Sequence, residues 1–132
     1  LSNLPIGLEA LECSYNHLIN LDNLPNSLET LCCIANNLSK LDDLPNSLID
    51  LRCYSNQIEN LDNLPHKLKI IYCQYNRIKS LQNLPPSLQE LYCDFNQIEL
   101  IDLIGTNLIN LRCMSNNIKS VLNVPSSIKY LK

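Results

Sequence analysis

The sequence predicts a repeat solenoid made almost entirely of β-strands and irregular segments, with a parallel sheet along one side. Three observations predict it. Apolar residues recur every 20 residues, each unit has apolar positions two residues apart, and nearly every unit closes on a proline-containing segment such as LDNLPNS at 21–27. A unit this short cannot enclose a core alone, so successive units must stack and share one.

The strand of each unit is predicted from its alternating pattern. Leu51 and Cys53 are two residues apart and point to the same side of a strand, while Arg52 points to the other side. The inward leucine column is Leu11, Leu31, Leu51, Ile71, Leu91, Leu111 and Leu131. Strands of about three to five residues, paired in parallel across seven units, would form a slab about 30 Å long.

The opposite, convex side is expected to be extended or polyproline-like, with at most a short 3₁₀ turn. Only about eight residues lie between its apolar anchors, and the proline removes a donor and fixes φ, which disfavours an α-helix. One unit departs from the pattern: in IDLIGTN at 101–107, Gly105 replaces the proline and Leu103 replaces Asn or Asp. We expect irregular curvature there, with Leu100, Leu103 and Leu122 exposed in columns that are polar elsewhere.

The pattern LxxLxCxxNxL followed by xxLxxLPxS resembles the short, 20-residue class of leucine-rich repeats over the whole chain, Leu1 to Lys132. That class is best known from bacterial effector proteins, and similar cysteine-bearing units occur in giant-virus proteins. The resemblance implies an α/β-type repeat in family terms, here almost all β or irregular: a horseshoe with a concave parallel β-sheet, used mostly to bind proteins. We expect a single domain over residues 1–132, with about six and a half repeats of a longer array.

Composition and motifs argue against several functions. The net charge of -3 favours neither nucleic acid nor an anionic membrane, and no apolar run approaches the roughly 18 residues of a spanning helix. Gly7 and Gly105 are the only glycines, and no phosphate loop or nucleophile elbow is present. We expect no enzyme activity, no catalytic residue, no cofactor, and neither nucleic-acid nor membrane partners.

The cysteine column looks chemical but is interpreted as core. It consists of Cys13, Cys33, Cys53, Cys73, Cys93 and Cys113. A collinear inward column offers no tetrahedral metal site, and disulfides between in-register strands would be strained. Buried free thiols acting as small hydrophobes indicate a reducing compartment, most simply the cytosol, including that of a host cell. Cys32 points outward instead and is either a reactive thiol or, more simply, an exposed bystander.

Two polar columns are also assigned structural roles. The asparagines are expected to bridge backbone groups of neighbouring coils, because an amide both donates and accepts. This column is Asn16, Asn36, Asn56, Asn76, Asn96 and Asn116. Asp22, Asp42, Asp62 and Asp102 recur on the convex side, where they could suggest calcium, but Gln82 interrupts them and turn or surface roles are preferred.

Function is expected in the columns that vary while pointing outward. The central column is Glu12, Cys32, Arg52, Tyr72, Tyr92 and Arg112, and the second column is Ser14, Ile34, Tyr54, Gln74, Asp94 and Met114. A third, here called the turn column, is Tyr15, Ala35, Ser55, Tyr75, Phe95 and Ser115, whose side chains are expected to be partly buried. Aromatic residues and arginine carry much of the binding energy at interfaces. The predicted contact residues are Arg52, Tyr54, Tyr72, Gln74, Tyr92, Asp94, Arg112 and Met114; a sheet preference of aromatic residues is the plainer alternative.

The sequence thus predicts a non-enzymatic protein-binding module. Two alternatives stay open: the substrate-recognition arm of a larger effector enzyme such as a ubiquitin ligase, and a structural spacer in an assembly. Charge is uneven, with nine acidic against two basic residues in 1–62 and four against eight in 63–132, which could orient a partner. No capping sequence is evident, so self-association through the open ends is also expected.

Overall fold

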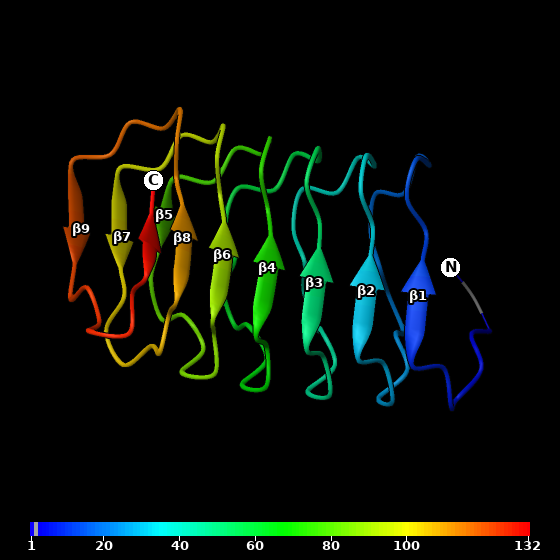
Figure 1. The fold of residues 1–132 in the computed structure, drawn as a ribbon. Helices are drawn as coiled ribbons and strands as arrows, with labels where there is room; N and C mark the ends of the chain where they lie inside the picture. The colour runs from blue at the N-terminus through cyan, green and yellow to red at the C-terminus, as the bar shows by residue number, and fades with distance from the viewer. Residues whose placement is uncertain (2) are drawn as a thin grey trace.

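A computed structural model of the chain describes Leu1 and residues 3–132 as a solenoid of stacked coils (Figure 1). One strand from each coil joins a seven-stranded sheet. Its strands, in spatial order, are β1 (Ala10–Glu12), β2 (Thr30–Cys32), β3 (Asp50–Arg52), β4 (Ile70–Tyr72), β6 (Glu90–Tyr92), β8 (Asn110–Arg112) and β10 (Tyr130–Leu131). All neighbours are parallel and paired 20 residues apart, as in Leu31 with Leu51 and Leu51 with Ile71. The predicted parallel sheet and its register are confirmed.

A second, smaller sheet lies on the opposite side of the coils, in the later half of the chain (Figure 1). It comprises β5 (Ser80–Leu81), β7 (Leu100–Asp102) and β9 (Ser120–Leu122), again parallel. The expected extended convex side therefore becomes a short sheet in these coils. Leu81, Ile101 and Val121 pair in register there, and the β-branched Ile101 and Val121 favour strand formation. Within the described residues, no helix is long and apolar enough to cross a membrane.

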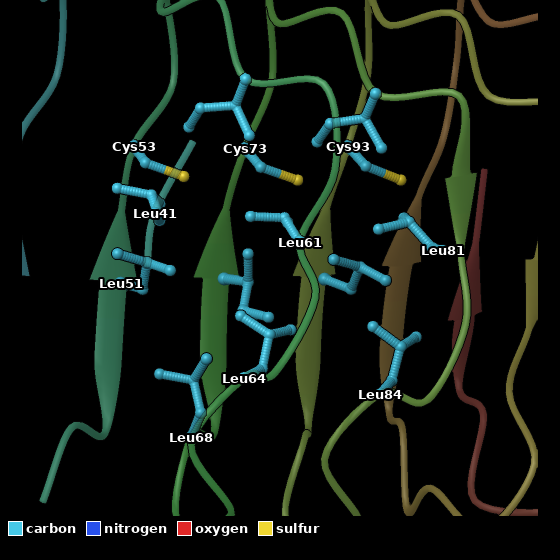
Figure 2. Packing of buried hydrophobic residues seen from close by; sticks show 14 of the residues in the cluster. Leu41, Leu51, Cys53, Leu61, Leu64, Leu68, Cys73, Leu81, Leu84 and Cys93 are labelled. Atoms are coloured by element: carbon cyan, nitrogen blue, oxygen red, sulfur yellow. The ribbon is translucent and has the colours of Figure 1, made fainter. Parts of the chain in front are cut away.

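The inward columns form one continuous core along the solenoid axis. Leu51, Cys53 and Ile58 are fully buried, and Leu61 closes the same coil from the convex side (Figure 2). The cysteine sulfurs follow one another in a row between the two sides of the coil (Figure 2). Burial of this row is close to uniform, because only Cys113 is half-buried.

The thiols in this row behave as small hydrophobes, as predicted. All seven cysteines are unpaired, and burial raises the pKa of Cys53 to about 12. The Cys93 Sγ donates to the Arg112 carbonyl oxygen at 3.2 Å, so the thiol satisfies a neighbouring backbone group instead of bonding another sulfur.

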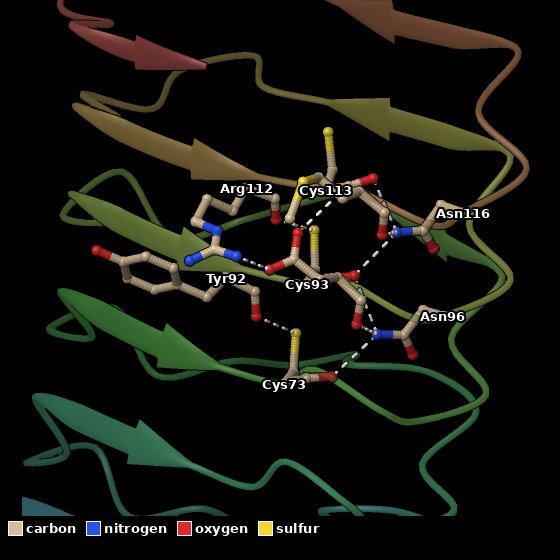
Figure 3. Close-up of polar contacts among 9 residues, drawn as sticks. Cys73, Tyr92, Cys93, Asn96, Arg112, Cys113 and Asn116 are labelled. Carbon is tan, nitrogen blue, oxygen red and sulfur yellow. Dashed lines mark hydrogen bonds and ion pairs between the residues drawn. The ribbon is translucent and has the colours of Figure 1, made fainter. Parts of the chain in front are cut away.

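The asparagine column forms the predicted bridge between coils (Figure 3). Asn76 is buried, and its Nδ2 donates to the carbonyl oxygens of Cys73, in its own coil, and Cys53, in the preceding coil, at 3.1 Å each. Its Oδ1 accepts from the Ile58 backbone N–H at 2.9 Å. The same set of bonds recurs at Asn36, Asn56, Asn96 and Asn116. Each of these five asparagines therefore fastens the end of one strand to the coil before it, whereas Asn16, among the described residues, bonds only within its own coil.

The irregular unit changes one turn without disturbing the sheet. In regular coils the residue two before the proline adopts positive φ, as at Asn63 (56°) and Asn83 (52°), but here positive φ moves to Gly105 (73°). Leu103 consequently turns inward and is fully buried, and Ile104 is 61% exposed instead. The expected exposure of Leu103 is therefore wrong; Leu100 is half-buried and Leu122 is exposed. Strands β6 and β8 keep their 20-residue register, so the pairing of the sheet continues unchanged through this unit, and irregular curvature stays a prediction.

Candidate protein-binding surface

The centre of the sheet's outward face is a stack of three side chains from three successive coils. The Tyr72 and Tyr92 rings are stacked, with centroids 4.5 Å apart and planes 7° apart. The Arg52 guanidinium carbon lies 5.5 Å from the Tyr72 ring centroid, on β3, the strand beside β4. We call Arg52, Tyr72 and Tyr92 the ridge. Because strands pair in exact 20-residue register, the ridge follows the solenoid axis.

Two carboxylates hold the ridge in place. Asp50 accepts from the Arg52 Nε at 3.2 Å and from Nη2 at 2.9 Å, and this bond keeps the pKa of Arg52 raised. Tyr92 Oη donates to Glu90 at 2.9 Å; burial first, and this bond second, raise the pKa of Tyr92 to about 12. Two of the three ridge side chains, Arg52 and Tyr92, are therefore each held by a carboxylate on their own strand.

Sequence reasoning missed the column that supplies these carboxylates. It lies two residues before the central column and comprises Ala10, Thr30, Asp50, Ile70, Glu90, Asn110 and Tyr130. The same two-residue alternation that predicted the central column also places this one outward, so the signal was present. Tyr130 completes the set: all six tyrosines and Phe95 lie in the outward and turn columns.

Beside the ridge, Arg112 and Asp94 form a cross-strand ion pair. Arg112 Nη2 lies 3.2 Å from Asp94 Oδ2, and Asp94 Oδ1 accepts from the Met114 backbone N–H at 2.8 Å. Asp94 is only 2% exposed, so it can act on a partner only by positioning Arg112. Figure 3 shows the Arg112 side chain extending to the same side as the Tyr92 ring, away from the cysteine and asparagine columns.

The structure brings the predicted contact residues onto one face with different degrees of exposure. Arg52 is exposed, while Tyr54, Tyr72, Gln74, Tyr92, Arg112 and Met114 are half-buried. Two buried atoms among them, Gln74 Oε1 and Arg112 Nε, have no hydrogen-bond partner among the described residues. Polar groups of this kind leave hydrogen-bonding capacity unused beside the ridge.

The turn column is partly buried, as expected, but unevenly. Ala35 and Ser55 are half-buried, whereas Tyr15, Tyr75 and Phe95 are 77%, 54% and 44% exposed. Tyr75 and Phe95 also form a stack of their own, with centroids 4.5 Å and planes 6° apart. Every residue of this column has positive φ, from Tyr15 (56°) to Ser115 (53°).

A shallow hollow of about 290 Å³ adjoins the ridge at the first three coils and contains Cys32 between Glu12 and Arg52. Cys32 is half-buried, and its Sγ lies 3.4 Å from the Ser14 hydroxyl. Burial raises the pKa of Cys32, so the thiolate is disfavoured at neutral pH. Of the two interpretations of Cys32, the geometry favours an unreactive thiol.

The convex side has wider hollows. One of about 500 Å³ is lined by Asp42, Asp43, Asp62 and Asn63. Across the residues that the structure describes, no group of three or more His, Cys, Asp or Glu side chains is arranged to hold a metal ion. Asp22, Asp42 and Asp62 are exposed, and Asp102 is half-buried.

Comparison with known proteins gives structural relatives. A scan of family models finds no match, and neither does a search of curated proteins. Among solved structures, YopM, a leucine-rich effector protein from Yersinia pestis, matches with a TM-score of 0.87 and 36% identity over 96% of this chain. The leucine-rich-repeat domain of a Shigella effector matches with a TM-score of 0.74 and 29% identity over 89% of this chain.

This chain spans 37% of that YopM chain and 64% of that Shigella chain. Both neighbours are leucine-rich-repeat proteins of bacterial effectors, and both share the solenoid described above. Repeat length, in-register parallel strands and these two likenesses agree. The chain has the fold of the leucine-rich-repeat solenoids found in bacterial effectors, built here from 20-residue repeats.

Proposed function

We propose that this chain binds a protein partner on the outward face of its seven-stranded sheet, with the ridge at the centre of the contact. The single observation that carries the proposal is the stack of Arg52, Tyr72 and Tyr92, fixed by Asp50 and Glu90. The likeness to effector leucine-rich-repeat domains supports the coarser statement that the fold serves protein interaction.

A fixed ridge favours binding because little side-chain entropy remains to be lost. Ordering a rotamer-rich side chain at an interface costs about 0.5–1.5 kcal/mol, and Asp50 and Glu90 already restrict the arginine and one tyrosine. Arg112, held by Asp94, adds an oriented guanidinium at the edge of the ridge. Tyr54 and Met114 supply adjacent apolar area.

The test uses peptides selected on the immobilised chain from a phage-displayed library of randomised sequences, with affinities measured by calorimetry. Replacing Tyr72 and Tyr92 together by alanine removes two central aromatic anchors, so affinity should fall at least about 30-fold, equivalent to about 2 kcal/mol. Tyr15→Ala is the matched control, because that tyrosine is exposed in the first coil and lies outside the ridge.

Circular dichroism must show that the double variant keeps its fold. Equal affinity of the double variant and the wild type would refute the ridge as contact centre. A spacer, the alternative structural function, would yield no reproducibly enriched peptide. The proposal also suits a recognition arm of a larger effector enzyme, because the structural neighbours extend beyond the length matched here.

The seven unpaired thiols support one further part of the proposal, that the chain works in a reducing compartment such as the cytosol. A cysteine-reactive mass tag applied to the chain in cell extracts under denaturing conditions should label all seven thiols. Labelling of fewer thiols without a reductant would indicate disulfides and contradict this location.

A further inference from the structure

Tyr75 and Phe95 combine two unfavourable features, left-handed backbone and exposed aromatic rings, that the turn does not require. All six residues of the turn column adopt left-handed φ, between 50° at Ala35 and 56° at Tyr15 and Ser55. Bulky side chains are rarely found there, whereas Asn is tolerated well. The equivalent convex position follows that preference, since it is Asn at 3, 23, 63, 83 and 123 and Asp at 43.

The turn itself does not need an aromatic ring. Ala35, Ser55 and Ser115 occupy the same position in other coils with nearly the same φ. Tyr75 and Phe95 are nevertheless 54% and 44% exposed, so their rings contribute little to the core. Strained residues that also expose apolar area are concentrated at functional sites.

The two rings leave one face each for a ligand. They stack on one another at 4.5 Å, and the neighbours in the column beyond them are Ser55 and Ser115, which are too small to cover the outer ring faces. A planar group of a partner can therefore extend the stack at either end. Offset or face-to-face ring contacts of this kind add to the energy of area burial.

The charge near the stack selects the partner. Arg77 and Lys79 follow Tyr75 by two and four residues, are exposed, and take part in none of the ion pairs found among the described residues. They belong to the half of the chain with an excess of basic groups. Exposed cations that lie two and four residues from an open aromatic ring complement a carboxylate that accompanies a ring in the partner.

We propose that the Tyr75–Phe95 stack is a second contact site, which binds an acidic protein segment whose aromatic or proline ring covers an open face of the stack while its carboxylate pairs with Arg77. The proposal rests on the proposed function in that the chain binds protein. It adds a site at the ends of the strands, outside the ridge.

The experiment selects peptides from the same randomised library on the wild type and on a variant carrying Tyr75→Asn and Phe95→Asn. Peptides enriched on the wild type should pair Asp or Glu with Phe, Tyr, Trp or Pro, and the variant should bind them at least about 10-fold more weakly. Because Asn suits left-handed φ, the melting temperature should fall by no more than about 2 °C. Ala35→Asn, at the same left-handed turn position two coils before Tyr75, is the matched control and should leave binding unchanged.

Arg77→Gln should remove the preference for acidic peptides. Lys69→Gln is the control, because Lys69 is an exposed cation at the other end of the strand, and it should leave that preference unchanged. A melting temperature lowered by 5 °C or more with undiminished peptide affinity would show that the stack is structural and overturn the inference. Loss of binding in the ridge variant alone would also overturn it and leave the proposed function intact. Loss in the Tyr75 and Phe95 variant alone would uphold it and refute the ridge.

Discussion

The two sides of a single strand follow different rules. On β3, Leu51 faces inward and is fully buried, like its equivalents in the neighbouring coils. Arg52, beside it, faces outward, and its equivalents are Glu, Cys, Tyr and Arg. The inward side is repeated because every coil must fit the same core. The outward side is free to differ because water accepts almost any residue there.

The constant side nevertheless sets the geometry of the variable side. In-register pairing places equivalent residues one strand spacing apart, about 4.8 Å. That spacing is close to the 4.5 Å found for both aromatic stacks. Two rings in one column of adjacent coils are thus brought to stacking distance by the core. The following predictions test this division between the two sides, from the largest expected effect to the smallest.

Removing one inner bridge should loosen two coils. Asn76→Ala leaves the Ile58 N–H without its acceptor and removes the donor shared by the Cys53 and Cys73 carbonyls, so the free energy of unfolding should fall by about 3 kcal/mol. Urea unfolding measures it. Asn16→Ala is the control. Asn16 is exposed and donates to the Cys13 and Ser14 carbonyl oxygens of its own coil, so its loss should be below about 1 kcal/mol. Equal losses would refute the bridging role.

The irregular turn should reject the residue that regular coils use. Gly105→Pro restores the repeat pattern, but proline requires φ near -65° and Gly105 has φ of 73°. The free energy of unfolding should fall by about 2 kcal/mol. Gly105→Asn, which tolerates positive φ, should cost less than half of this in the same urea titration. A stabilising proline would mean that the turn has the regular conformation after all.

Alkaline pH should weaken the core through its thiols. The pKa of Cys53 is raised from 9.0 to about 12 by burial, so the folded chain keeps this thiol protonated where the unfolded chain ionises it. The contribution of the protonated Cys53 thiol to the free energy of unfolding is complete below pH 9 and is lost as pH rises from 9 to 12. At pH 10 the loss is about 1.4 kcal/mol for this thiol. The free energy of unfolding of the Cys53→Val variant should fall correspondingly less between pH 8 and 10 than that of the wild type. Equal falls in the two proteins would contradict the burial effect.

Much of the fold was predictable because repetition makes weak local signals reinforce each other. One Leu–x–Cys triplet does not specify a strand, but six such triplets at 20-residue spacing do, and so does the asparagine at each strand end. The same periodicity assigned the outward columns and therefore the ridge. The column two residues before the central column, which contains Asp50 and Glu90, was overlooked although the same 20-residue period and two-residue alternation place it outward.

Other features depend on contacts that no single unit contains. Leu103 was expected outside because its column is polar elsewhere, yet transfer of positive φ to Gly105 turned it inward. The exposed Tyr75 and Phe95 rings follow from left-handed backbone, which residue type alone would not suggest for an aromatic. Asp94 looked like a contact residue and is buried beneath Arg112, because it caps the Met114 amide.

The small sheet of β5, β7 and β9 adds backbone pairing to the later coils. From Ser80 onward, coils are paired into sheets on both sides. The described coils before it have a sheet on one side and single backbone bonds on the other, such as those from the Asn37 N–H to the Leu18 carbonyl and from the Glu59 N–H to the Ser39 carbonyl. Peeling one coil from the next therefore breaks more backbone hydrogen bonds in the later coils than in the earlier ones. The ridge begins on β3 and ends on β6, so it spans the boundary between these two kinds of coil.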